Sequence, residues 1–163
     1  MTDTEKPLLS EESLARIARE IAKYPPQRKA SAVMAALRIA QDEYGWLSEP
    51  LMDYVAQLLG MRPIEVYEVA TFYTMYDLKP VGKHQISVCT NVSCMLNGAG
   101  QVVKHLENRL GIRLGETTAD GRFTLKEAEC LAACGGAPMF MLDKTYYENL
   151  TPERIDEILG SLE

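Results

Sequence analysis

Four cysteines constrain this chain more than any other feature of its sequence. They form two close pairs, Cys89 with Cys94 and Cys130 with Cys134, and thirty-five residues separate the pairs. Four thiolates that converge can bind zinc, bind an iron–sulfur cluster or oxidise to two disulfides. A fold that uses all four must bring two loops, distant in the sequence, to one place.

The composition of the chain narrows these choices. Lys and Arg number 17 and Asp and Glu 23, and the resulting net charge of −6 repels the phosphates of nucleic acids. The first residues lack an export pattern, and no stretch reaches the ~18 apolar residues of a membrane span. We therefore expect a soluble protein of a reducing compartment, where cysteines bind metals or carry out redox chemistry.

The first half of the chain has the periodicity of short amphipathic helices. Capping residues, prolines and glycines mark the ends of four such stretches, at residues 10–24, 29–44, 48–59 and 63–76. The short connections predict a small helical bundle. In the fourth stretch, Phe72, Tyr73 and Tyr76 are either part of the core or anchors for a partner protein.

The pattern changes at residues 78–83, where Pro80 and Gly82 interrupt it. We place the domain boundary there, with a helical bundle over residues 1–80 and a second domain over residues 81–163. Strand, helix, strand, hairpin and helix are expected in the second domain, at residues 85–89, 95–110, 122–130, 139–147 and 152–162. This order predicts an α/β or α+β fold with both cysteine pairs in loops at strand ends, where scaffolds present their chemistry.

The spacing of the cysteines favours one kind of site. Zinc accepts C-x4-C but less typically C-x3-C, and dithiol catalysis asks for C-x2-C, which neither pair has. An iron–sulfur cluster needs thiolates in loops of small residues, with N–H groups directed at sulfur, which residues 90–93, Gly135 and Gly136 could supply. The cluster is the favoured interpretation, with one iron for each pair of a 2Fe-2S cluster, and zinc and thiol chemistry stay open. We expect neither His84 nor His105 to be a ligand, because His105 falls within a helix and four cysteines complete the set.

Three stretches of the sequence resemble one known family. They read F-Y-T-M-Y-D-L-K-P-V-G-K-H-Q-I-S-V-C-T-N-V-S-C-M-L-N-G-A, E-C-L-A-A-C-G-G-A-P-M and Y-Y-E-N-L-T-P-E. They are similar to the NuoE-type 2Fe-2S subunits of bacterial NADH:quinone oxidoreductase, respiratory complex I, and the similarity covers nearly the whole chain. The resemblance implies a helical N-terminal segment and a thioredoxin-like β-α-β-β-β-α domain that carries one 2Fe-2S cluster. The implied ligands are Cys89, Cys94, Cys130 and Cys134, the first two on one iron and the last two on the other.

The resemblance also implies how such a chain works. It implies one-electron transfer within an NADH dehydrogenase, with no catalytic substrate chemistry in this chain itself. The implied partner is a flavin subunit that binds FMN and NADH, in a heterodimer within a peripheral arm on the cytoplasmic face of the inner membrane. The alternatives are the equivalent subunit of an NAD-reducing hydrogenase or formate dehydrogenase, and a zinc-stabilised interaction protein. One position departs from the family, because Ala132 stands where glycine is frequent, and alanine is strained there if its φ is positive.

Overall fold

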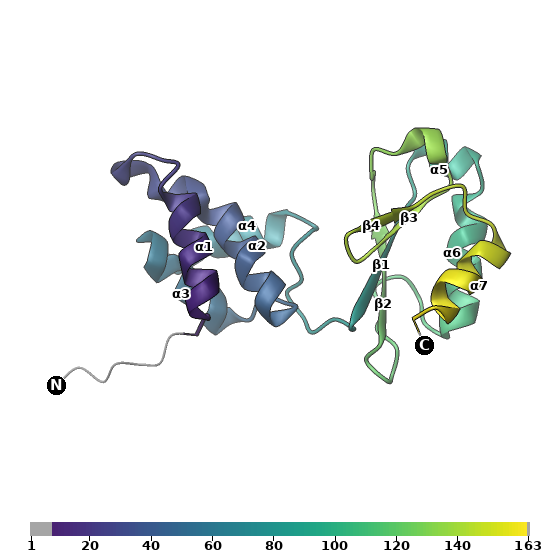
Figure 1. Cartoon of the computed structure of the whole chain (residues 1–163), viewed down its shortest axis with the longest axis horizontal. Helices are drawn as coiled ribbons and strands as arrows, with labels where there is room; N and C mark the ends of the chain where they lie inside the picture. The colour runs from purple at the N-terminus through teal and green to yellow at the C-terminus, as the bar shows by residue number, and fades with distance from the viewer. Residues whose placement is uncertain (1–7, 163) are drawn as a thin grey trace. The chain divides into compact units, whose positions relative to one another are not determined.

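The computed structural model describes residues 8–162 of the chain. Contacts between Cα atoms divide the chain into two compact units, Met1–Pro80 and Val81–Glu163. The first unit contains helices, and the second contains a sheet with helices, as Figure 1 shows. Within the described residues, no helix has the length and hydropathy that crossing a bilayer requires. The observed mixture of helices and a sheet confirms the predicted α+β class.

Four α-helices and one 3-10 segment build the first unit. They are α1 (Glu11–Ile21), η1 (Pro26–Ala32), α2 (Val33–Tyr44), α3 (Glu49–Leu59) and α4 (Pro63–Phe72). The predicted cap of α1 is present, since the Ser10 hydroxyl accepts a hydrogen bond from the N–H of Ser13, whereas Ser48 precedes α3 without a side-chain capping bond. Gly45 ends α2 with a left-handed φ of 80°, which glycine adopts without a steric penalty. The apolar faces of α1 to α4 pack into one core centred on Ile17, Leu37 and Val55.

The fourth helix is shorter than the sequence pattern predicts. It ends at Phe72, and the following Tyr73 has an extended backbone. Tertiary hydrogen bonds explain this end, because the Gln41 side chain donates to the carbonyl of Met75 and accepts from the N–H of Asp77. Tyr76 therefore lies outside the helix but is buried. Its hydroxyl donates to the carbonyl of Met34 at 2.9 Å.

The two interpretations of these aromatic residues separate in the structure. Tyr76 is 5% exposed and belongs to the core of the first unit, whereas Phe72 is 77% exposed. Tyr73 lies between them at 40% exposure and packs edge to face against both rings. The core interpretation is therefore right for Tyr76 and wrong for Phe72.

The second unit is a four-stranded sheet with two long helices on one face (Figure 1). Its elements are β1 (His84–Cys89), α5 (Val92–Leu96), α6 (Ala99–Leu110), β2 (Phe123–Ala128), η2 (Cys134–Gly136), β3 (Phe140–Leu142), β4 (Thr145–Tyr147) and α7 (Pro152–Gly160). The strand order is β2-β1-β3-β4, with β1 parallel to β2 and antiparallel to β3. The central position of β1 brings the loops after β1, after β2 and before β3 to the same end of the sheet.

The core of the second unit lies between the sheet and its helices. Ile86 of β1 pairs with Leu125 of β2 on one side and with Leu142 of β3 on the other, and all three side chains are buried. Leu106 of α6 and Ile155 of α7 complete this cluster from the helix layer. In the middle of β1, buried Ile86 and Val88 alternate with half-buried Ser87, as the two-residue period of a strand requires, and Cys89 at its end is buried as well.

Two predicted elements of the second unit have other boundaries in the structure. The helix expected at residues 95–110 is divided into α5 and α6 by Gly98, whose φ of 96° ends one helix and starts the next. The strand expected at residues 122–130 ends at Ala128, so Cys130 follows the strand in a loop. The first difference places Cys94 within the short helix α5, and the second leaves Cys130 outside regular structure.

Candidate metal centre

The first cysteine pair is buried at the end of the central strand. Cys89 is the last residue of β1, and Cys94 is the third residue of α5. Their exposed fractions are 4% and 2%. They share a small buried cluster with Ala99, the first residue of α6, and with Met139, which precedes β3. The positions of both sulfurs are therefore set by the packing of the fold.

The environment of these two thiols separates their acidities. Burial disfavours the Cys89 thiolate, but hydrogen bonds from the N–H groups of Asn91 and Leu131 and from the Cys94 thiol lower the pKa of Cys89. Burial raises the pKa of Cys94, and the neighbouring Cys89 sulfur raises it further. Of these two thiols, Cys89 is therefore the one that loses its proton more readily. The deprotonated thiolate is the form that binds a metal.

The second cysteine pair lies at the surface. Cys130 follows β2, Cys134 is the first residue of η2, and both thiols are exposed. Between them Ala132 has a left-handed φ of 58°, and its N–H donates to Cys130 Sγ at 3.4 Å. This conformation costs an alanine roughly 1 to 2 kcal/mol, so the strain expected for alanine at this position is present.

The two cysteine loops meet at one end of the sheet. The N–H of Leu131, in the second loop, is close enough to Cys89 Sγ in the first to lower the pKa of Cys89. The Cys134 side chain is close enough to contribute to the raised pKa of Cys94. Among residues 8–162, no three His, Cys, Asp or Glu side chains are already gathered around a common metal position. The structure therefore brings the two pairs to one region, with one pair buried and the other at its surface.

The donor set fits a metal–sulfur group. All four cysteines are free thiols, and backbone N–H groups hydrogen-bond to the sulfurs of Cys89, Cys94 and Cys130. Such N–H groups stabilise thiolate sulfur that carries negative charge, as cluster ligands do. Soft thiolate ligands suit iron–sulfur clusters, zinc and Cu(I), and suit magnesium, calcium or manganese poorly.

We expected the glycines in the loop between Cys130 and β3 to direct N–H groups at sulfur. In the structure, Gly136 is needed for close packing instead. Gly136 is buried, and a Cβ atom on it would lie 2.4 Å from the Glu148 side chain. Its N–H donates to the carbonyl of Ala133 and not to a sulfur, which differs from the prediction. Gly135 has open space at its Cβ position. Gly136 therefore serves close packing of the loop.

Sequence reasoning missed two residues that contact the sulfurs. Met139 is fully buried, its N–H donates to Cys94 Sγ, and its carbonyl accepts from the N–H of Cys89 at 3.2 Å. Leu131 contributes through its backbone N–H alone. Only the pairing of β3 beside β1 could have identified Met139, because that register places it opposite Cys89.

The two histidines hydrogen-bond to carboxylates. His84 Nδ1 lies 3.0 Å from Asp143 Oδ2, and His105 Nε2 lies 3.1 Å from Asp156 Oδ1. His105 is in α6, as predicted, and Asp156 is in α7, so this contact joins the two helices.

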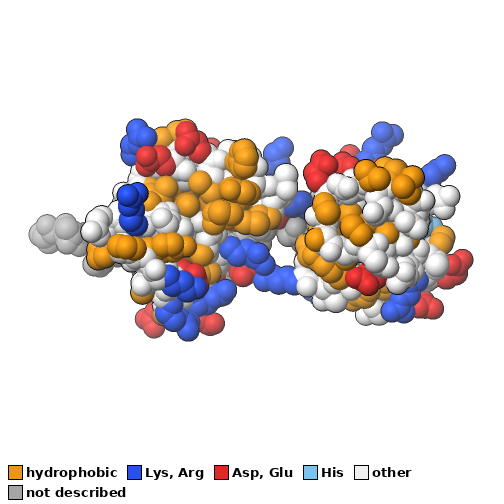
Figure 2. Space-filling model, turned by 90° about the horizontal axis from the view of Figure 1, so that it is seen from above, with side chains coloured by type: hydrophobic (Ala, Val, Ile, Leu, Met, Phe, Trp, Pro, Cys, Tyr) orange, Lys and Arg blue, Asp and Glu red, His pale blue; other side chains and the backbone are white. Residues whose placement is uncertain are grey.

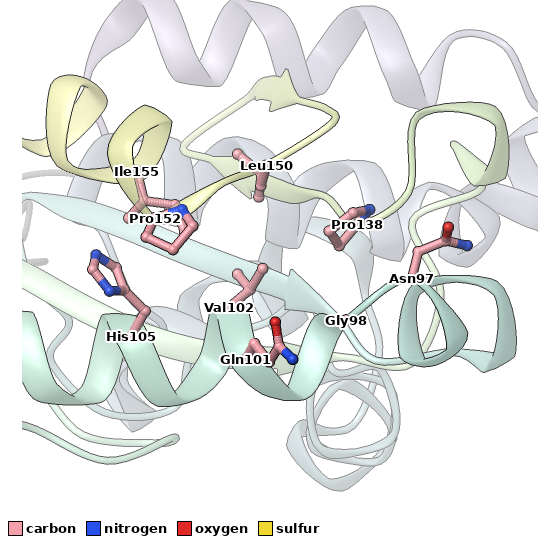
Figure 3. A pocket seen from close by; sticks show the side chains of 9 residues that line it. All are labelled: Asn97, Gly98, Gln101, Val102, His105, Pro138, Leu150, Pro152 and Ile155. Carbon is pink, nitrogen blue, oxygen red and sulfur yellow. The ribbon is translucent and has the colours of Figure 1, made fainter.

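A small cavity beside α6 is not a second functional site. Figure 3 shows Gln101, Val102 and His105 of α6 on one side of it and Leu150 and Ile155 on the other. Its volume of about 50 Å³ is well below the ~300 Å³ of ordinary ligand pockets. Its lining mixes apolar and polar side chains from α6, from the start of α7 and from the loops before both helices and before β3.

Comparison with known proteins agrees with this geometry. Residues 17–163 match the family described as thioredoxin-like [2Fe-2S] ferredoxin. The E subunit of NADH-quinone oxidoreductase from Rickettsia conorii is 48% identical over 144 residues, which cover 88% of this chain and 86% of the relative. An E subunit of NADH-quinone oxidoreductase from Rhizobium meliloti is 49% identical over 140 residues, covering 86% and 82% of the two chains.

More distant matches extend the same relationship. Mitochondrial NADH dehydrogenase [ubiquinone] flavoprotein 2 of Dictyostelium discoideum is 42% identical over 154 residues, 94% of this chain and 62% of the relative. A crystal structure of NAD+-reducing [NiFe]-hydrogenase in the air-oxidized state matches with a TM-score of 0.68 and 21% identity. That match covers 77% of this chain and 22% of the hydrogenase chain, and at this identity it supports the fold alone.

Proposed function

Because this chain belongs to the thioredoxin-like [2Fe-2S] ferredoxin family, we propose that its four cysteines hold one 2Fe-2S cluster. Cys89 and Cys94 would bind one iron, and Cys130 and Cys134 the other. The observation that carries this proposal is the meeting of the two cysteine loops, because the order and direction of β1, β2 and β3 bring both loops to one end of the sheet. When bound, the cluster accepts and returns one electron at a time.

The side chains and backbone around the sulfurs determine how well such a site tolerates negative charge and how accessible it is to a partner. The buried first pair places one half of the site in a low-dielectric environment, which disfavours added negative charge. The N–H groups of Asn91, Leu131, Ala132 and Met139 oppose this by stabilising charge on sulfur. The exposed second pair leaves the other half accessible to an electron-transfer partner.

We propose that this partner is a separate subunit that binds NADH and FMN, and that single electrons pass between its FMN and the cluster. The relatives named as E subunits of NADH-quinone oxidoreductase support this assignment over a hydrogenase or formate dehydrogenase module. The chain would then act as an enzyme subunit in a peripheral arm on the cytoplasmic face of the inner membrane.

The surface next to the cysteines supports a protein partner. Three apolar side chains of α5 flank the buried Cys94 and are themselves exposed: Val92 at 69%, Met95 at 53% and Leu96 at 82%. Hydrophobic side chains interrupt the charged surface of both units in the view of Figure 2. Exposed apolar groups beside a functional site are typical of the centre of an interface, since a partner removes them from water.

We further propose that the two compact units are separate domains, a helical bundle over residues 1–80 and the cluster domain over residues 81–163. Each has its own buried core, one around Leu37 and the other around Phe140. All four cysteines lie in the second unit. The first unit would then take part in assembly with the other subunits and would supply no ligand to the cluster.

Reduction by NADH tests the proposed electron exchange. The isolated chain with its cluster should stay oxidised when NADH is added, because it has no flavin, and should be reduced once the FMN-binding subunit is present. A Leu96→Asp variant should keep its cluster but lose this reduction, because the charge would be buried at the interface. Tyr146→Asp, on the exposed face of β4, is the matched control and should be reduced normally. Direct reduction of the isolated chain by NADH would contradict the proposal.

A further inference from the structure

One residue in the second cysteine loop has an unusual backbone. Among residues 8–162, three residues other than glycine have a positive φ: Ala132, Asp143 and Asn149. Aspartate and asparagine tolerate this conformation, because their short polar side chains hydrogen-bond locally, but alanine has no such group. The conformation of Ala132 must therefore be maintained by its surroundings.

The chain on either side of Ala132 is fixed. Cys130 follows directly after β2, which pairs along its whole length with β1. After Ala132, the N–H of Gly136 donates to Ala133, and the carbonyl of Gly136 accepts from the N–H of Asn149 at 2.7 Å. Hydrogen bonds thus hold the chain on both sides of Ala132, and the residue with a positive φ between these two anchors is Ala132.

The left-handed backbone at Ala132 directs two successive N–H groups toward sulfur. The N–H of Ala132 donates to Cys130 Sγ at 3.4 Å, and the N–H of Leu131 is close enough to Cys89 Sγ to lower the pKa of that thiol. Successive N–H groups in such a turn form a concave site for anions, known from phosphate and iron–sulfur sites. Here the two acceptors belong to different cysteine pairs, so this short segment connects the two halves of the site.

We propose that Ala132 is a positioning residue for the cluster, and that its left-handed backbone sets the midpoint potential by holding both N–H groups against sulfurs of the two cysteine pairs. The inference rests on the 2Fe-2S cluster proposed above. Each N–H donor favours the reduced and more negative state of the sulfurs, so these donors raise the potential. The Ala132 side chain is exposed, so a substitution there acts through the backbone and not through packing.

Substitutions at position 132 separate the backbone from the side chain. Glycine adopts a positive φ freely, so A132G should keep both hydrogen bonds and the wild-type midpoint potential. Valine is strongly disfavoured at a positive φ, so A132V should release both N–H groups and shift the potential to a lower value. The matched control is Ala128→Val, two residues before Cys130 in the extended backbone of β2, and it should leave the potential unchanged.

The measurement is a redox titration of the full-length protein with its cluster, followed by electron paramagnetic resonance. If A132V assembles no cluster, the decisive variant has lactic acid at position 132, which keeps the methyl group and replaces the N–H by an ester oxygen. Its potential should fall below that of the wild type. A wild-type potential in A132V, or in the ester variant, would overturn the inference while leaving the cluster assignment intact. A wild-type protein without iron would instead refute the proposed function.

Discussion

Replacing Cys89 with alanine is expected to leave the protein without its 2Fe-2S cluster. Cys89 is the thiol with the most hydrogen-bond donors on its sulfur, and its pKa is lowered despite burial. It is also the contact point of the two cysteine loops, through the N–H of Leu131. Its loss removes one ligand and also the acceptor that connects the second loop to the first.

Iron content measures this effect most simply. The Cys89→Ala protein, purified without oxygen, should contain almost no iron, against about two atoms in the wild type. Its fold should survive, because alanine fits the small apolar cluster formed with Ala99 and Met139. Ser93→Ala, in the neighbouring helix α5, is the control and should retain the cluster. A Cys89→Ala protein with its full iron content would show that the ligand set has been assigned wrongly.

Phe140→Ala is expected to cause the largest loss of stability. Phe140 is fully buried in β3, lies opposite Val88 of β1 and Tyr147 of β4, and packs against the ring of Tyr147 at 5.6 Å. Removing a buried phenylalanine side chain costs about 3 to 5 kcal/mol, a large part of the ~5 to 15 kcal/mol that stabilises a typical domain. The preceding Met139 contacts both buried cysteines, so we also expect faster loss of the cluster.

Hydrogen exchange measured on peptides of the intact chain can locate this loss. Peptides from β1 and β3 should lose protection that corresponds to ~3 to 5 kcal/mol, whereas peptides from α2 and α3 should keep theirs if the two units are separate domains. Tyr146→Ala, on an exposed position of the same hairpin, should change protection by less than about 0.5 kcal/mol. Equal effects of the two substitutions would contradict the assignment of Phe140 to the core.

Local chemistry made much of the fold predictable. The caps at Ser10 and Thr151, the glycines that end helices and the hairpin turn at Asp143 are local signals, and each element that they delimit is present. The end of α4 was predicted wrongly because tertiary contacts override local preference there. The segment after α4 has apolar residues at a helical spacing. The Gln41 side chain, however, hydrogen-bonds to the backbone of this segment and holds it in a non-helical conformation.

The candidate site was predictable in its residues and less so in its geometry. The spacing of the cysteines predicted the four thiols, and the structure brings both pairs to one end of the sheet, but Cys94 lies in α5 and not in the loop expected there. The sequence did not reveal that one pair is buried and the other exposed, because burial of Cys89 and Cys94 depends on the register of β3 beside β1. For the same reason Met139, which contacts both buried cysteines, had no sequence signature.

The proposed electron transfer depends on these four cysteines holding a single 2Fe-2S cluster. The most direct test is to purify the protein without oxygen and to measure iron, zinc and acid-labile sulfide, with electron paramagnetic resonance after reduction. We predict a red-brown protein with about two irons and two sulfides per chain and a rhombic signal in the reduced state. A colourless protein that contains one zinc per chain and no labile sulfide would contradict this account.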